Sequence, residues 1–202
     1  LREELIAWNP PPVPDGPVSV RLDHAFPVKG VGTVALGFVQ RGTLRAHDRL
    51  RLWPTDREVE IRSIQSQDVD VREAGQGTRV GVALKGVDAD EISRGQVLGP
   101  ASGPTVGDRF VLRDRRDSRY YRGRVEKGAQ LQFLVGLQLV PARLESVALD
   151  RLELSTDRPV VADPGDPVWL ADLSAAPGPR IVARAVLDEL KLDTPDTTSS
   201  SV

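Results

Sequence analysis

Hydrophobic and polar residues alternate with a period of two along most of the chain from Val18 onward. Short segments rich in Val, Ile and Leu follow this pattern, and Gly, Asp or Pro separates them about every ten residues. Strands at that spacing, without helices between them, predict a closed barrel or a sandwich. The strands predicted in the first half are residues 18–26, 33–40, 48–53, 58–65 and 79–86.

A second β-rich block follows the break at Ala101-Ser102-Gly103-Pro104. Its turn signals include Asp163-Pro164-Gly165-Asp166, and Leu187 to Leu192 is expected to form one last helical turn. The predicted fold class is therefore all-β, with two consecutive small β-barrels at 17–100 and 101–190. The β-rich segments of this second block are residues 109–114, 124–147, 149–155, 167–173 and 179–187.

Both ends of the chain differ in pattern from these blocks. Residues 1–16 combine helical spacing at Leu1, Leu5 and Trp8 with a Pro-rich stretch. They are interpreted as a helix end and linker from a preceding domain, or alternatively as an N-terminal cap. The chain contains no methionine, which suggests a fragment. Residues 191–202 are rich in Ser and Thr and are expected to be a disordered polar tail.

Composition narrows the chemistry. Cysteine is absent and only two histidines occur, which excludes disulfides, thiolate metal sites and histidine-rich metal sites. The chain has no apolar run of membrane-spanning length and no signal-peptide pattern at its N-terminus, so the prediction is a cytoplasmic protein without a membrane partner. A net charge of −2 does not by itself indicate nucleic-acid binding, although it can conceal a locally basic face.

Catalytic motifs are missing from the sequence. Lys29-Gly30-Val31-Gly32-Thr33 is Gly-rich but lacks the spacing of a GxxxxGK[ST] phosphate loop. HExxH, GxSxG and paired-carboxylate patterns do not occur either. The prediction is that this chain by itself is not an enzyme.

Several segments carry a resemblance to translational GTPases. Residues 23–52 (DHAFPVKGVGTVALGFVQRGTLRAHDRLRL) resemble the opening of the second domain of EF-Tu-like factors. Residues 78–86 (TRVGVALKG) and 92–98 (ISRGQVL) resemble its central and closing strands. His47-Asp48 departs from the family, which usually has Gly-Asp in that turn. Residues 135–147, 165–173 and 179–187 resemble the third domain of the archaeal and eukaryotic selenocysteine-specific (SelB) group.

This resemblance implies a role in translation. Domain II of such factors holds the aminoacylated end of tRNA, and domain III contacts the tRNA backbone. The implied partners are aminoacyl-tRNA, the ribosome and a GTPase domain in cis. No cofactor is expected in this chain, since GTP and magnesium would belong to the GTPase domain.

The resemblance also implies an aminoacyl-binding set, namely Asp23, His24 and Arg79, which would recognise the selenocysteine side chain. A selenol is more acidic than a thiol and is expected to be an anion at neutral pH. Arg79 is always cationic and His24 can become so, so both can donate charge-assisted hydrogen bonds to it. Asp23 would orient the imidazole. The alternative is ordinary surface residues at strand ends.

The most basic stretch, residues 113–124, mixes Arg with two Tyr and suits phosphate and sugar contact. Its alternating Arg and Asp residues could instead form a solvated, salt-bridged loop. The predicted RNA-binding residues are Arg41, Arg94, Arg119, Tyr120, Tyr121, Arg122, Arg124 and Lys127.

Three functions remain open from the sequence. The first is the tRNA-binding module of a SelB-like elongation factor. The second is a paralogue with a lost or degenerate GTPase domain that binds the ribosome or RNA and regulates translation. A β-barrel enzyme or small-molecule binder is the third, and it lacks a convergent catalytic set.

Overall fold

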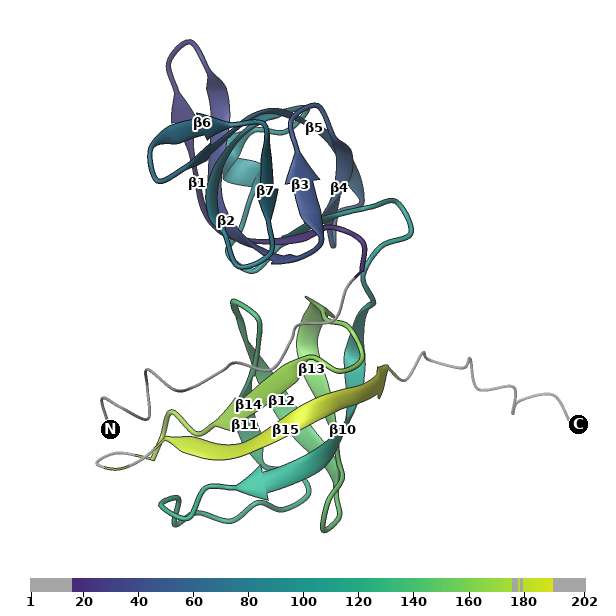
Figure 1. Ribbon diagram of the computed structural model, residues 1–202. Coiled ribbons are helices and arrows are strands. Elements are labelled where there is room, and N and C mark those ends of the chain that lie inside the picture. Colours follow the sequence, from purple (N-terminus) through teal and green to yellow (C-terminus); the bar gives the residue numbers. More distant parts are fainter. Residues whose placement is uncertain (1–15, 176–177, 179, 191–202) are drawn as a thin grey trace, which may run out of the picture.

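The computed structural model describes residues 16–175, 178 and 180–190. These residues form two β-barrels placed one above the other and joined by a short connection (Figure 1). The prediction of an all-β chain with two consecutive barrels is confirmed. The predicted N-terminal helix end and the polar tail lie outside the described residues, except for Gly16.

The first barrel closes through six strands in the order β4-β9-β1-β2-β8-β5, because β5 pairs back with β4. The short strand β6 extends the sheet beyond β5, and β3 pairs separately with β7. A single 3-10 turn (Ala89–Glu91) precedes the last strand. The strands are β1 (Ser19–Val28), β2 (Gly32–Arg41), β3 (Thr43–Arg45), β4 (Arg49–Trp53), β5 (Arg57–Ser66), β6 (Val69–Val71), β7 (Glu73–Gly75), β8 (Arg79–Lys85) and β9 (Val97–Gly99).

The second barrel is closed in the order β10-β13-β12-β11-β14-β15. Its last strand continues to Leu190, so the helical turn predicted from Leu187 is wrong for residues 187–190. Leu187 is fully buried and Leu190 pairs with Phe110, which strand geometry allows and a helical turn would prevent. The strands are β10 (Val106–Asp117), β11 (Gln130–Val135), β12 (Gln138–Val147), β13 (Leu152–Val161), β14 (Pro167–Ala171) and β15 (Ile181–Leu190).

Alternation along each strand explains both interiors. On β2, Ala35 and Val39 are fully buried while Leu36 and Phe38 face outward and are only half-buried. Each barrel therefore encloses its own apolar core. The first core consists of Val, Leu, Ile and Ala side chains, and the second of Val, Leu, Ala and Phe side chains. Two separate cores predict two independently packed barrels, whose mutual placement depends on the contacts between them.

Turn chemistry follows the local backbone. His47 adopts a φ of 73°, in the left-handed region that favours glycine, at the position where the sequence departs from the Gly-Asp of related factors. Its neighbour Asp48 accepts a hydrogen bond from the backbone N–H of Arg45 at 2.8 Å, which stabilises this turn. Gly37 faces the carbonyl group of Arg21 so closely that a Cβ atom there would overlap it.

Polar contacts join the two barrels. Arg21 of β1 has 1% of its surface exposed and donates hydrogen bonds to the Val161 carbonyl at 3.0 Å and to Asp166 Oδ2 at 2.9 Å. Burial lowers the pKa of the Arg21 guanidinium, while the carboxylates of Asp166 and Asp163 act in the opposite direction. A second pair joins Arg41 to Asp163 at 2.6 Å. The junction is thus built from directional, charged interactions, which favour one orientation of the barrels.

Two further features complete the description of the fold. Within the described residues, no helix is long and apolar enough to cross a bilayer. The same part of the chain contains no group of three or more His, Asp or Glu side chains arranged to hold a metal ion.

Candidate aminoacyl and RNA-binding surfaces

Asp23 occupies a bulge in β1. Leu22 pairs with Gly37 and His24 pairs with Leu36, so Asp23 is the extra residue of β1 and has no register partner on β2. Its carboxylate forms an ion pair with Arg94 at 3.3 Å, across the turn that precedes β9. In the structure, Asp23 therefore pairs with a neighbouring guanidinium, whereas the sequence pattern suggested that it orients His24.

His24 and Arg79 lie on the same outer face of the first barrel. His24 pairs with Leu36 of β2, and Arg79 pairs with Phe38 of the same strand from the other side. With strands about 4.8 Å apart and a rise of about 3.4 Å per residue, their Cα atoms lie roughly 12 Å apart. Both side chains are exposed, and Leu36 lies on the strand between them.

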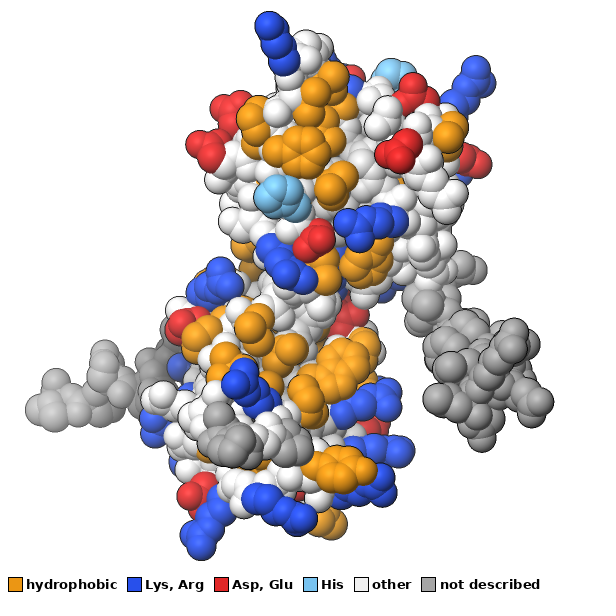
Figure 2. Space-filling model, turned by 90° about the vertical axis from the view of Figure 1, so that its left-hand side faces the viewer, with side chains coloured by type: hydrophobic (Ala, Val, Ile, Leu, Met, Phe, Trp, Pro, Cys, Tyr) orange, Lys and Arg blue, Asp and Glu red, His pale blue; other side chains and the backbone are white. Residues whose placement is uncertain are grey.

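A hollow of about 600 Å³ lies beside Arg79. Leu36 and Gly81 form part of its lining, and Gly81 leaves space because it has no side chain. On the other side of Leu36, the His24 ring lies 5.8 Å from that of Phe26 in a tilted arrangement. Figure 2 shows hydrophobic side chains gathered around a histidine on the upper barrel, with acidic and basic groups below it. The surface thus has an apolar floor, with the Arg79 guanidinium on one side of Leu36 and the His24 imidazole on the other.

The predicted RNA-binding residues fall in three different places. Arg41 lies in the junction, where it is about one-quarter exposed and paired with Asp163. Arg94 is exposed and lies next to the second barrel, in a depression shared with Leu134 and Leu139. The other six lie in the loop that connects β10 to β11. The structure therefore does not bring the predicted set together on one surface.

Within that loop, two tyrosines have opposite roles. Tyr120 is 55% exposed. The Arg119 guanidinium lies over the Tyr120 ring, with its Cζ atom 4.7 Å from the ring centroid. Tyr121 instead packs against the barrel core and donates a hydrogen bond to Asp172 at 2.8 Å. Burial, and then this bond, raises the pKa of Tyr121. Tyr121 thus anchors the loop, and Tyr120 with Arg119 remains available to solvent.

The loop and the preceding strand differ in charge pairing. On β10, Arg113 pairs with Asp114 and Asp188, and Arg115 makes two contacts with Asp117. Arg122, Arg124 and Lys127 are exposed, and none of them forms an ion pair with a described residue. The salt-bridged alternative is therefore realised on the strand, whereas positive charge remains available on the loop.

Known proteins show similarity to both barrels. Residues 32–99 match the family model described as elongation factor Tu domain 2. Over these residues the first barrel is similar to this domain family. The domain 2 barrel and the second barrel together are similar to translation elongation factor SelB of Methanococcus maripaludis, with a TM-score of 0.82 and 27% identity over 94% of this chain and 46% of that one.

Two relatives from Methanocaldococcus jannaschii extend this similarity. A selenocysteine-specific elongation factor is 29% identical over an alignment 188 residues long, which covers 88% of this chain and 38% of that protein. An uncharacterized protein is 39% identical over 175 residues, or 87% of this chain and 56% of that protein. The chain thus spans about half or less of each relative's length, and its two barrels are elongation-factor-like domains related to SelB.

Proposed function

We propose that this chain is the tRNA-binding module of a SelB-like translation elongation factor, acting in the cytoplasm with the ribosome and a GTPase domain. The observation that carries the proposal is the match of both barrels, over 94% of the chain, to a SelB structure. In this proposal the domain 2 barrel holds the aminoacyl end, and the loop between β10 and β11 contacts the tRNA backbone. GTP hydrolysis belongs to the GTPase domain.

The proposed amino acid is selenocysteine, recognised at the surface formed by His24, Leu36 and Arg79. A selenolate lying over Leu36 accepts hydrogen bonds from the Arg79 guanidinium and, when protonated, from the His24 imidazole. Asp23 neutralises Arg94 beside this surface, so Arg79 remains the cation directed at the ligand. A serine hydroxyl is neutral and leaves both groups without a counter-charge, which disfavours it.

Binding of selenocysteinyl-tRNA and seryl-tRNA under reducing conditions tests the proposal. Arg79→Ala and His24→Ala are expected to weaken the selenocysteinyl complex by about 10-fold or more, since a hydrogen bond to a charged group contributes about 1.5–3 kcal/mol. The seryl complex should change much less. Arg49→Ala, which removes an exposed arginine of β4, is the matched control and should affect neither complex.

An equal loss for both tRNAs would contradict selenocysteine recognition. A separate arm tests the loop, because phosphate contacts make affinity fall with salt. The triple variant Arg119→Gln, Arg122→Gln and Arg124→Gln should weaken both complexes and reduce that salt dependence. An unchanged salt dependence would remove the loop from the proposal.

One observation favours a second candidate, a paralogue that regulates translation without an active GTPase domain. The two aligned segments are similar in length, 175 and 188 residues, yet they cover 56% of the uncharacterized relative and 38% of the selenocysteine-specific factor. The more identical relative therefore has much less sequence outside the barrels. Binding of a labelled GTP analogue by the protein purified from its natural source distinguishes the two candidates, since only the elongation factor should bind it.

A further inference from the structure

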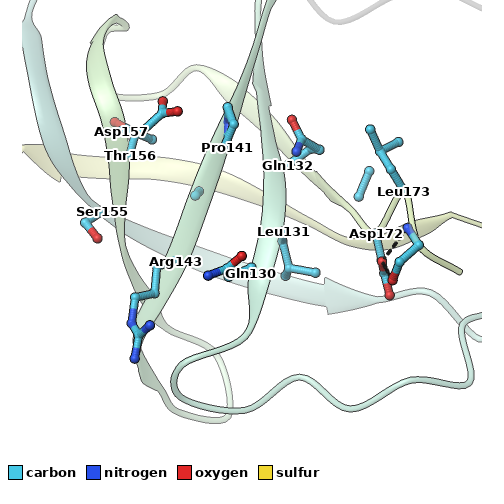
Figure 3. A pocket seen from close by; sticks show the side chains of 13 residues that line it. Gln130, Leu131, Gln132, Pro141, Arg143, Ser155, Thr156, Asp157, Asp172 and Leu173 are labelled. Carbon is cyan, nitrogen blue, oxygen red and sulfur yellow. Dashed lines mark hydrogen bonds between the residues drawn. The ribbon is translucent and has the colours of Figure 1, made fainter.

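The second barrel carries a pocket of about 550 Å³ on its outer face. It lies across β13, β12, β11 and β14, which are neighbours in the barrel (Figure 3). This volume is within the range of about 300–1,000 Å³ typical of small-molecule sites. The pocket belongs to a different barrel from the proposed aminoacyl surface.

Several polar side chains at the pocket are already used within the protein. Ser155 donates to Glu145 at 2.7 Å, and Thr156 donates to the Arg158 carbonyl at 2.8 Å. Asp172 accepts bonds from Tyr121 and Ser174. Four lining side chains form no hydrogen bond or ion pair with any described residue, and they are the groups available to a ligand: Gln130, Gln132, Arg143 and Asp157.

One end of the pocket suits a phosphate. Arg143 of β12 and Gln130 of β11 are direct cross-strand partners, so both side chains leave the same face of the sheet. A guanidinium offers several N–H donors to phosphate oxygens, and the neighbouring carboxamide adds another. Together they form an anion-binding pair.

The other end suits a nucleobase. Gln132 pairs directly with Pro141, and Asp157 follows Thr156, the partner of Ala142, so Pro141 lies between Gln132 and Asp157. The proline ring offers an apolar surface for the flat face of a base. Asp157 then provides two acceptors at one edge, and Gln132 provides a donor and an acceptor at another.

The separation of the two ends fits one nucleotide. Arg143 pairs with Ser155, two residues from Asp157, which places the Arg143 and Asp157 Cα atoms about 8 Å apart. Figure 3 shows these two side chains at opposite ends of the pocket. The distance between their charged groups is therefore larger than the Cα separation, which leaves room for a ribose between phosphate and base.

Among the four RNA bases, guanine matches these donors and acceptors. Its N1–H and exocyclic amine are adjacent donors, which a carboxylate can accept together, and its O6 and N7 can accept from the Gln132 amide. We propose that this pocket binds a guanosine monophosphate unit, either as a free nucleotide or as an unpaired guanosine within an RNA strand. Arg143 holds the phosphate and Asp157 selects the base.

Titration of the isotopically labelled full chain by NMR tests this assignment, with GMP, AMP, CMP and UMP as separate probes. GMP should shift the backbone amide signals of residues 130–132, 142–143 and 155–157 and bind at least about 10-fold more tightly than the other three. Arg143→Gln and Asp157→Asn should each weaken GMP binding by about 10-fold or more. Arg116→Gln, on the opposite side of the barrel, is the matched control and should leave binding unchanged.

A second arm identifies the source of the nucleotide. A nine-residue oligouridine with one central guanosine is compared with the same strand without it. Guanosine-dependent binding at these residues by the oligonucleotide alone assigns the pocket to RNA, whereas binding of GMP assigns it to a free nucleotide. The proposal is overturned if neither probe shifts these residues, if the four bases bind equally, or if both variants bind normally. Such a failure leaves the aminoacyl proposal intact, because that surface is on the first barrel.

Discussion

Replacing Arg21 with Met should weaken the junction between the barrels. The substitution keeps an unbranched apolar stem but removes the guanidinium, which donates to Asp166, the Val161 carbonyl and Gln40. Removing one partner of a buried ion pair destabilises a protein by about 3–5 kcal/mol. Asp166 retains bonds from the backbone N–H of Asp163 at 3.0 Å and from Gln40 at 3.3 Å, so the lower end, about 3 kcal/mol, is expected.

Urea denaturation followed by tryptophan fluorescence measures this loss. Trp53 lies next to the connection between the barrels and Trp169 lies on the second barrel, so both report on unfolding. Asp166→Asn and the double variant complete a thermodynamic cycle. The double variant should be less destabilised than the sum of the single variants by about 1–3 kcal/mol, because no uncompensated carboxylate remains.

Arg49→Met, at an exposed position of the same barrel, is the control and should change the free energy of unfolding by less than about 0.5 kcal/mol. If Arg21→Met lowers the free energy of unfolding by less than about 1 kcal/mol, and the effects of the two variants simply add, the junction does not depend on this pair.

Two smaller changes test packing and pH dependence. Gly37→Ala should destabilise the first barrel by about 1–3 kcal/mol, because the new Cβ would overlap the Arg21 carbonyl; thermal unfolding checks this, and an unchanged Tm would refute the close approach. Tyr121→Phe should lower the free energy of unfolding by about 1 kcal/mol through loss of the bond to Asp172. Because the pKa of Tyr121 is raised above its ordinary value of 10.0, its contribution to stability is complete below pH 10.0 and is lost as the pH rises through the folded-state pKa. Absorbance titration of the two tyrosines should therefore show one late phase, which is absent from Tyr121→Phe.

The period-two pattern predicted the barrels because a strand with one buried face repeats every two residues. Residues 33–40, for example, became β2 almost unchanged. The same criterion failed at Leu187, because a leucine three residues before Leu190 suits a helical turn and a strand equally well. Pairing of Leu187 with Leu112 and of Leu190 with Phe110, on a strand far earlier in the chain, decided between them.

Long-range contacts also limited the prediction of the site. The family resemblance implied that Asp23 orients His24, but in the structure Asp23 lies in a bulge and pairs with Arg94. Arg41 was predicted to contact RNA, and in the structure it pairs with Asp163, more than 120 residues away in the chain. The local sequence identifies the charged side chains. Their ion-pair partners are far away in the chain and become known only from the closed fold.

The junction has a mechanical consequence for the two proposed binding surfaces. If two barrels were joined at one point only, they could rotate freely relative to each other. Contacts at two points would still allow rotation about the line that joins those points. Here the barrels meet through the connection around Pro100, the turn at Asp163 to Asp166, and the turn where Gly95 lies against Gln138. These three contacts restrict how far the first barrel's outer face can move relative to the loop at Tyr120. Under the proposed function, a tRNA that contacts both surfaces has to span this restricted distance.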